Sequence, residues 1–286
     1  DEYVEILWAC MKRLWPDLKR KEKKFQISIS HDVDTPFAAA GRPWRQILKN
    51  LGGDLIKRRD GKLFFRRLWT KTTGNWEKDP YNTFQFIMNI SERYDLKSTF
   101  FFKAGASHPS FDEDYSLNDF RLQRLMRSIH ERGHEIGFHP SYGSYNDYDV
   151  LRSEYERFRE TLEKLDIRQE KWGSRQHYLR FEIPTTWQIL EEVGIDYDSS
   201  LGFADHVGFR CGTCMEFPVF DIKTRRRLQL KEYPLLAMDC TLFANEFMGL
   251  TPLLALEYVK RLARTWRRYE GRFTLLWHNS TLTTGF

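Results

Sequence analysis

Residues 27–34 read Ile-Ser-Ile-Ser-His-Asp-Val-Asp, an apolar alternation that ends in two acids, and Thr35-Pro36 follows. The alternation predicts a strand. Residues two apart in a strand point to the same face, so Asp32 and Asp34 should stand side by side where the strand leaves the core. Two adjacent carboxylates raise each other's pKa unless a cation or a hydrogen-bond donor lies between them. We therefore expect metal binding or acid–base chemistry here, with a solvated turn as the simpler alternative.

The composition is typical of a globular protein with a large core. The chain has 286 residues, of which 41% are hydrophobic and 15% aromatic, enough for one barrel-sized domain or two smaller ones. No apolar run approaches the roughly 18 residues of a membrane span, and the charged N-terminal residues show no signal peptide. The four cysteines suit a reducing compartment rather than a disulfide framework, so we expect a cytoplasmic protein.

The net charge of the chain gives little indication of its binding partners. The net charge of +5 is a mild excess that does not call for nucleic acid. Basic clusters are denser locally, and in residues 62–69, Lys-Leu-Phe-Phe-Arg-Arg-Leu-Trp, they interleave with aromatic residues. Such a run would suit an anionic glycan or a membrane surface. The alternative is a solvated helix face whose aromatic side chains pack inward.

Strand and helix patterns alternate along most of the chain, which predicts a parallel sheet with crossover helices, either a barrel or an open doubly wound sheet. We divide the chain into an N-terminal helical extension, residues 1–24, and a barrel, residues 25–286. A basic, aromatic insertion covers about 43–80. The expected strands are 25–31, 98–102, 133–139, 171–175, 195–197, 216–220, 232–238 and 273–277, and the expected helices are 1–20, 81–94, 117–131, 150–165, 184–193 and 252–269.

The placement of ionisable residues favours the barrel. Each of six such residues lies at or just past the carboxyl end of a predicted strand, where a barrel gathers its chemistry at one mouth. They are Asp32, Asp34, His139, Arg175, Asp198 and His278.

These segments also resemble, in order, the motifs of the polysaccharide deacetylases, the NodB-homology enzymes of carbohydrate esterase family 4. The resemblance spans roughly residues 25–280 and is to the branch whose first motif is Asp-Val-Asp. It implies a distorted (β/α)7-type barrel. The matching segments are Ser30-His-Asp-Val-Asp34, Ser98-Thr-Phe-Phe-Phe102, Gly133-His-Glu-Ile-Gly-Phe-His139, Ser174-Arg-Gln-His-Tyr178, Asp198-Ser-Ser200 and Leu275-Leu-Trp-His278.

The resemblance implies roles for four of these residues in hydrolysis. Asp32 would be the general base, and Arg175 would hold it in place. Such a pair would also keep Asp32 ionised beside a second carboxylate. His278 would protonate the leaving amine, and Asp198 matches the acid that orients this histidine.

The resemblance further implies a divalent metal, zinc in most of the family, with Asp34 and His139 as ligands. Four residues after His139 the family has a second histidine, but this chain has Gly143. Two protein ligands are fewer than the three typical of catalytic zinc. Three explanations stay open: a ligand from the loop, a ligand from elsewhere, or no tightly bound metal. The candidate ligands are Ser144, Asn146 and Asp147 in the loop, and His177 and His206 elsewhere.

The expected function is a metal-dependent hydrolase that removes N-acetyl or related acyl groups from amino sugars of a polysaccharide or its precursor. The alternatives are a catalytically impaired barrel that binds a glycan and a related amidohydrolase of small cyclic amides. A carbohydrate is the expected partner, with neither nucleic acid nor a transmembrane segment. The candidate substrate-binding residues are Tyr142, Tyr178, His177 and His206.

Overall fold

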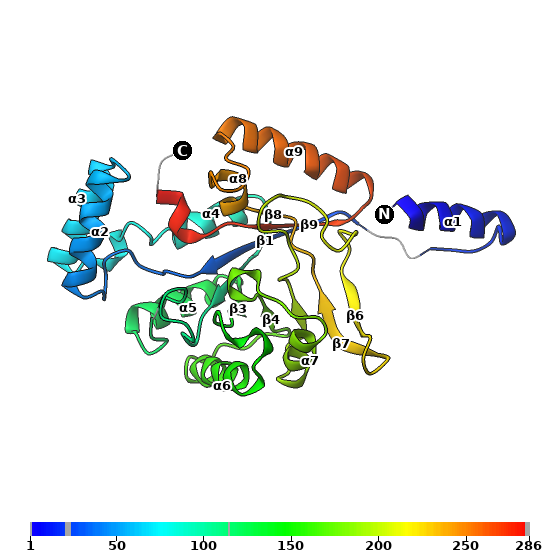
Figure 1. The fold of residues 1–286 in the computed structure, drawn as a ribbon, viewed down its shortest axis with the longest axis horizontal. Helices are drawn as coiled ribbons and strands as arrows, with labels where there is room; N and C mark the ends of the chain where they lie inside the picture. Colours follow the sequence, from blue (N-terminus) through cyan, green and yellow to red (C-terminus); the bar gives the residue numbers. More distant parts are fainter. Residues whose placement is uncertain (1, 21–23, 114, 284–286) are drawn as a thin grey trace.

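A nine-stranded sheet forms the centre of the computed structural model, which describes residues 2–20, 24–113 and 115–283. The strand order is β6-β7-β5-β4-β3-β2-β1-β9-β8, and all neighbours are parallel except β6 and β7. The sheet curls into a half-barrel (Figure 1), so the expected distorted α/β barrel is confirmed. The strands are β1 Gln26–Val33, β2 Ser98–Phe102, β3 Glu135–Phe138, β4 Gly173–Ser174, β5 Tyr197–Asp198, β6 Phe217–Asp221, β7 Arg226–Glu232, β8 Ala237–Met238 and β9 Arg272–Leu276.

Helices cover the outside of the curved sheet, with α5, α6 and α7 below it and α8 and α9 above it in Figure 1. Apolar residues of α5 recur at helical spacing, and Leu122, Leu125, Met126 and Ile129 are all buried. They join the main core with phenylalanines of β2 and β3. The bounds are α4 Phe84–Arg93, α5 Phe120–Glu131, α6 Tyr148–Lys164, α7 Thr185–Glu192, α8 Asp239–Phe243 and α9 Pro252–Arg268.

Two further helices, α2 Trp44–Ile56 and α3 Gly61–Thr73, form a hairpin at one end of the molecule (Figure 1). The buried guanidinium of Arg67 donates to Asp54 at 2.8 Å and to the carbonyl of Ala38 at 2.7 Å. Asp79 accepts the backbone N–H groups of residues 38–40. The hairpin is therefore tied to the segment that follows Asp34.

The N-terminal helix α1, Glu2–Leu14, projects from the opposite end of the molecule (Figure 1). The proposed domain boundary at residue 24 adjoins residues 21–23, which lie outside the described residues. Of the helices in the described part of the chain, none combines the length and the apolar character that a membrane crossing requires.

Most predicted strands shift by one or two residues at their ends, but one is divided in the structure. Residues 232–238 were expected to form a single strand, but β7 ends at Glu232 and β8 begins at Ala237. Instead, β7 begins at Arg226 and pairs antiparallel with β6. Its buried positions alternate at Leu228, Leu230 and Glu232, so the basic cluster at 225–227 concealed a strand with period two.

Candidate functional site

Parallel neighbouring strands bring the predicted polar residues to one edge of the sheet. Asp32 lies near the end of β1, and Asp34 follows that strand. His139 follows β3 and donates its backbone N–H to Phe102 at 2.9 Å, while Arg175 follows β4 and donates to Phe138 at 3.0 Å. These bonds extend the ladder one residue past each strand, which fixes where the side chains leave the sheet.

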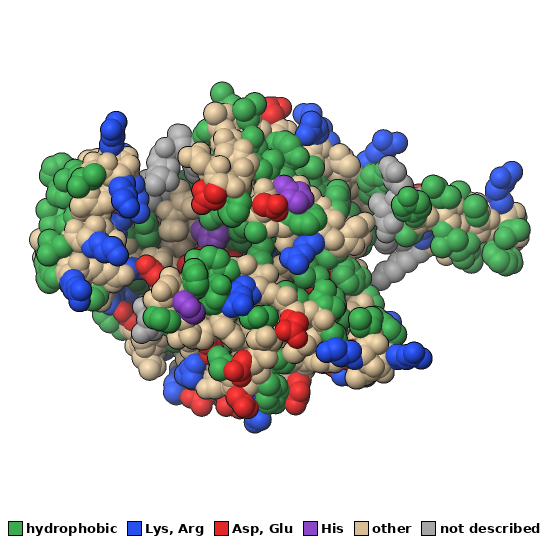
Figure 2. Space-filling model, in the orientation of Figure 1, with side chains coloured by type: hydrophobic (Ala, Val, Ile, Leu, Met, Phe, Trp, Pro, Cys, Tyr) green, Lys and Arg blue, Asp and Glu red, His purple; other side chains and the backbone are tan. Residues whose placement is uncertain are grey.

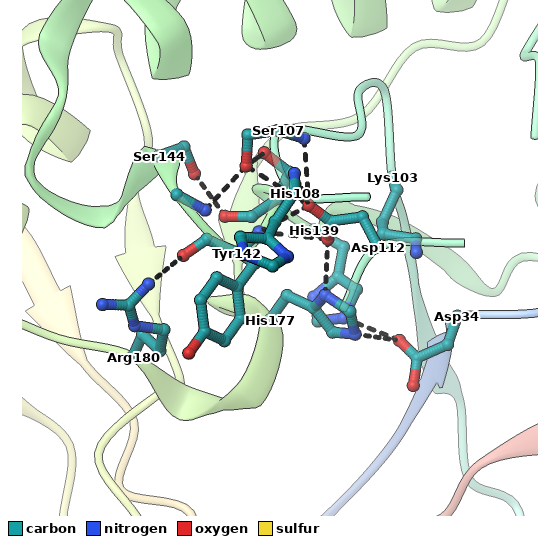
Figure 3. Close-up of polar contacts among 12 residues, drawn as sticks. Asp34, Lys103, Ser107, His108, Asp112, His139, Tyr142, Ser144, His177 and Arg180 are labelled. Atoms are coloured by element: carbon teal, nitrogen blue, oxygen red, sulfur yellow. Dashed lines mark hydrogen bonds and ion pairs between the residues drawn. The ribbon is translucent and has the colours of Figure 1, made fainter. Parts of the chain in front are cut away.

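Asp34, His139 and His177 form a cluster at this edge (Figure 3). Oδ1 of Asp34 lies 3.1 Å from Nε2 of His139 and 3.3 Å from Nε2 of His177. The other ring nitrogens are anchored: Nδ1 of His139 contacts the Arg175 carbonyl, and Nδ1 of His177 lies 2.7 Å from Asp112. Both imidazoles are buried, whereas the Asp34 side chain is 32% exposed.

The hydrogen bonds of this cluster fit a bound cation. A carbonyl and a carboxylate oxygen only accept, so both Nδ1 atoms must carry a hydrogen. In neutral imidazoles the two Nε2 lone pairs then face an Asp34 oxygen that has no hydrogen to share. A cation between these three donor atoms would satisfy them. Outer acceptors that orient ligating histidines in this way are typical of metal sites.

The charges at the cluster are consistent with this fit. Burial would raise the pKa of Asp34, but the three surrounding histidines, His139, His177 and His278, hold that pKa well below its usual range. Burial lowers the pKa of His177, although Asp112 opposes the shift. The cluster therefore offers an ionised carboxylate and, in His177, a neutral imidazole near pH 7.

Among the alternatives to the missing motif histidine, His177 is the residue that the structure places beside Asp34. At Gly143, an added Cβ would lie 2.9 Å from Oγ of Ser107, so the position faces that hydroxyl. The other candidates make different bonds. Ser144 bonds to Ser141, Asn146 to Glu182 and His206 to Asp205, and Asp147 caps α6.

Asp32 and Arg175 lie next to the cluster in the interior. Nη1 of Arg175 is 3.7 Å from Oδ1 of Asp32, and Nη2 donates to Ser199 at 2.9 Å. Both side chains are buried, and Oδ1 of Asp32 has no hydrogen-bond partner. Oδ2 of Asp32 lies 3.9 Å from His139. Asp32 thus has an unpaired oxygen able to accept a proton, and the positive charge of Arg175 lies 3.7 Å from that oxygen.

His278 lies on the other side of Asp34, with Nε2 3.6 Å from Oδ2 of that residue. Its Nδ1 lies 2.7 Å from Asp239, which also accepts the His278 backbone N–H at 2.9 Å. Burial alone would lower the pKa of His278, but the adjacent Asp239 carboxylate raises it well above its usual value. This shift favours the protonated imidazolium of His278, the form that can act as an acid.

The prediction that Asp198 orients His278 is wrong. Asp198 accepts hydrogen bonds from Ser174 at 2.6 Å and from the backbone and hydroxyl of Ser200 at 2.8 and 2.9 Å. It is fully buried beneath the site. Asp239 pairs with His278 instead, because it directly follows β8, whose neighbour β9 leads to His278. The sequence signal that could have identified Asp239 is its position directly after the predicted strand 232–238.

A cavity of about 350 Å³ opens at the site, and its lining includes Asp32, Asp34, His177 and His278. Tyr178 and His177, two of the four candidate substrate-binding residues, line this cavity. Neither Tyr142 nor His206 is part of the lining. Tyr142 stacks on Phe111 with ring centroids 4.4 Å apart, and the exposed His206 stacks on Phe203.

The sequence patterns did not reveal two parts of the site, namely a portion of the cavity wall and the residue that anchors His177. Glu246 and Phe247 form part of the cavity wall in the segment after α8. Asp112 anchors His177 and also accepts the backbone N–H groups of Ser107 and His108. Asp112 lies in an irregular segment between β2 and α5, so no periodic pattern marks it.

The half-barrel with a cluster of histidines and carboxylates at its mouth matches a known class of fold. A protein from Mycobacterium smegmatis named as a polysaccharide deacetylase superposes with a TM-score of 0.55 and 22% identity, covering 92% of this chain and 80% of that one. Puue allantoinase gives 0.52 at 14% identity over 92% and 80% of the chains. A protein from Pseudomonas aeruginosa PAO1 named as a polysaccharide deacetylase gives 0.52 at 12% over 90% and 79%.

The chain therefore has the polysaccharide-deacetylase fold that its motifs indicate, a fold that it shares with an allantoinase. Neither the protein-family models nor the curated protein sequences include a match to it.

Proposed function

We propose that this protein is a metal-dependent hydrolase that removes N-acetyl or related acyl groups from amino sugars of a polysaccharide or its precursor. The observation that carries the proposal is the convergence of two buried histidines on Asp34, between Asp32 on one side and His278 on the other. The shared fold with proteins named as polysaccharide deacetylases supports the same reaction class.

Asp34, His139 and His177 are the proposed ligands of a divalent ion, zinc in the first instance. Such an ion would polarise the acyl carbonyl and lower the pKa of the attacking water. Asp32 is placed to take the proton from that water, because its Oδ1 is unpaired and Arg175 lies 3.7 Å from it. Arg175 thereby places a positive charge beside the proposed base.

His278 is the proposed general acid. Cleavage of an amide leaves an amine nitrogen that must gain a proton, and a histidine held protonated by Asp239 can donate one. Its Nε2 lies 3.6 Å from Oδ2 of Asp34, and both His278 and Asp32 line the cavity. The proposed base and the proposed acid are thus separate side chains beside the proposed metal site, as a hydrolysis with separate proton acceptor and donor requires.

Acetate release from an acetylated amino-sugar oligomer tests this proposal. Asp32→Asn and His278→Ala should each lower kcat by at least about 100-fold, since each removes one proton-transfer group. His206→Ala is the matched control, because this exposed histidine lies outside the cavity lining, and its rate should equal that of the wild type. Unchanged rates in both site variants would refute the assigned roles.

A second candidate substrate is a small cyclic amide, favoured by the fold shared with Puue allantoinase and by the modest size of the cavity. The same residues would act on the ring C–N bond. Assaying an acetylated amino-sugar oligomer and allantoin side by side separates the two. If the protein hydrolyses allantoin but not the oligomer, its substrate is a small cyclic amide rather than an amino sugar, and the proposed roles of the site residues stand.

A further inference from the structure

The hairpin of α2 and α3 exposes a set of large apolar side chains. Leu48, Ile56 and Phe65 are 63%, 78% and 69% exposed, and Trp44, Leu55 and Trp69 are also exposed. None of these six side chains belongs to the core of the hairpin. That core consists of Ile47 and Leu51 packed with Ala39 and partly buried residues of α3. The alternative in which the aromatic residues of 62–69 all pack inward does not hold for Phe65 and Trp69, which are exposed.

The same hairpin carries a clear excess of positive charge. Residues 44–73 contain nine Lys and Arg and two Asp, a net charge of +7, whereas the whole chain has +5. The rest of the chain is therefore slightly acidic, at −2. The two acids do not offset the exposed basic residues, because Asp54 is buried against Arg67 and Asp60 caps α3. Figure 2 shows Lys and Arg scattered among the hydrophobic side chains at this end of the molecule.

We propose that this hairpin surface docks the protein on an anionic lipid bilayer. The surface consists of the six exposed apolar side chains and the exposed basic residues around them, Arg45, Lys49, Lys57, Arg58, Arg59, Lys62 and Arg66. Amphipathic helices with Trp, Phe and Leu beside Lys and Arg insert into the boundary between headgroups and acyl chains. A hydrated glycan offers stacking to aromatic rings but nothing to Leu48, Leu55 or Ile56, so the aliphatic residues favour lipid.

The hairpin lies at the edge of the barrel that carries the site. It follows the carboxyl end of β1, and Arg67 and Asp79 fix it to residues 38–40, shortly after Asp34. Docking through this surface would hold that edge of the barrel beside the bilayer. The inference does not depend on the proposed reaction, because binding is measured without substrate.

Co-sedimentation of the full chain with vesicles tests the inference. The wild type should bind vesicles that contain phosphatidylglycerol, and binding should weaken with added salt and be at least about tenfold weaker to pure phosphatidylcholine. Ile56→Ser with Phe65→Ser, and separately Lys57→Gln with Arg59→Gln, should each weaken binding to anionic vesicles by roughly tenfold. Leu253→Ser with Leu256→Ser is the matched control, because these exposed leucines lie on α9, and should bind as the wild type.

Circular dichroism would show that each variant is folded. The inference would be overturned if the wild type binds no vesicles, if it binds both vesicle types equally, or if the α9 control loses as much binding as the hairpin variants. Light scattering tests a further contrary outcome. If the wild type is a dimer and Ile56→Ser with Phe65→Ser makes it a monomer, the surface binds a second copy of this chain instead.

Discussion

His177 is the residue on which the site depends. The family pattern places its second histidine four residues after His139, where this chain has glycine, yet an imidazole still reaches Asp34 from the turn that follows β4. Its position is set by Asp112, whose carboxylate accepts from Nδ1 at 2.7 Å, and by its backbone N–H, which donates to Pro140 at 3.1 Å. The proposed third ligand thus comes from another strand end, where the fold holds the ring in place.

Asp112→Asn tests this anchoring. The amide can present a hydrogen rather than a lone pair to Nδ1, so the ring should lose its fixed tautomer and orientation. We expect zinc affinity to fall by about 10–100-fold, measured by competition with a chelator. Asp205→Asn alters the equivalent contact at the exposed His206 and should leave affinity unchanged. Equal affinities for all three proteins would exclude Asp112 as an anchor.

The Asp239–His278 pair predicts a pH dependence. Asp239 raises the pKa of His278, so the acid stays protonated as pH rises through the range where an ordinary histidine would lose its proton. Asp239→Asn removes that charge, lowers the pKa of His278 and should move the alkaline limb of kcat/KM to lower pH. Activity should therefore fall more at pH 8 than at pH 6.

Cys240→Ser is the control for this profile, because its sulfur also lies 3.7 Å from Nδ1 of His278 but carries no charge as a thiol. It should shift the alkaline limb far less than Asp239→Asn does. An alkaline limb that stays in place in the Asp239 variant would show that another group, and not His278, donates the proton.

At the scale of elements, the loops on either side of the α2–α3 hairpin are built around one buried acid. Asp79 accepts N–H groups from residues 38–40 and from Tyr81, so a single side chain supplies the acceptors that a helix or strand would otherwise provide in these loops. The loops both support Asp34 and carry the hairpin. Their stability should depend on Asp79 more than on the helix caps.

Asp79→Ala should therefore lower the free energy of unfolding by about 3 kcal/mol, because it leaves several buried N–H groups without acceptors. Asp60→Ala provides the comparison, since it removes one cap from α3 and should cost about 1 kcal/mol. Urea unfolding measures both. A loss in Asp79→Ala no larger than that in Asp60→Ala would contradict this account of the loops.

Sequence patterns predicted those elements whose signal is local. Strands β1, β2, β3 and β9 carry buried apolar runs, and their ends mark Asp32, Asp34, His139 and His278. The predicted partner of His278 was wrong because Asp198 and Asp239 both follow strand-like segments. Only the order of strands in the sheet shows which of the two acids lies beside His278. Asp112 was missed because its role arises from a contact with a residue 65 positions away.

At the scale of the whole molecule, the half-barrel buries ionisable groups beneath its site. Arg175, Asp198 and Glu232 are fully buried near the ends of β4, β5 and β7. Burial raises the pKa of both acids, and the negative charge of Asp198 raises that of Glu232 further. The positive charge of Arg175 opposes both shifts and so offsets part of the free-energy cost of burying the two acids.

This arrangement predicts how stability varies with pH. An acid whose pKa is raised on folding contributes stability that is complete below its unfolded pKa, about 4.3 for Glu, and is lost as pH rises through the folded value. Glu232→Gln should thus gain stability relative to the wild type between pH 5 and pH 8. The substitution also lowers the free energy of unfolding by an amount that is the same at both pH values, because it disturbs the hydrogen bonds that Trp187 and the Leu201 N–H donate to Glu232. Urea unfolding at both pH values would measure the change, and a difference that is the same at both would contradict it.

The most direct test of the proposed site is the zinc affinity of the metal-free protein, compared between the wild type and His177→Ala. If Asp34, His139 and His177 hold the ion, the wild type binds about one equivalent, and the variant binds at least about 100-fold more weakly because it retains only two protein ligands. Wild-type loading below about a tenth of an equivalent, or equal affinity in the two proteins, would contradict the account.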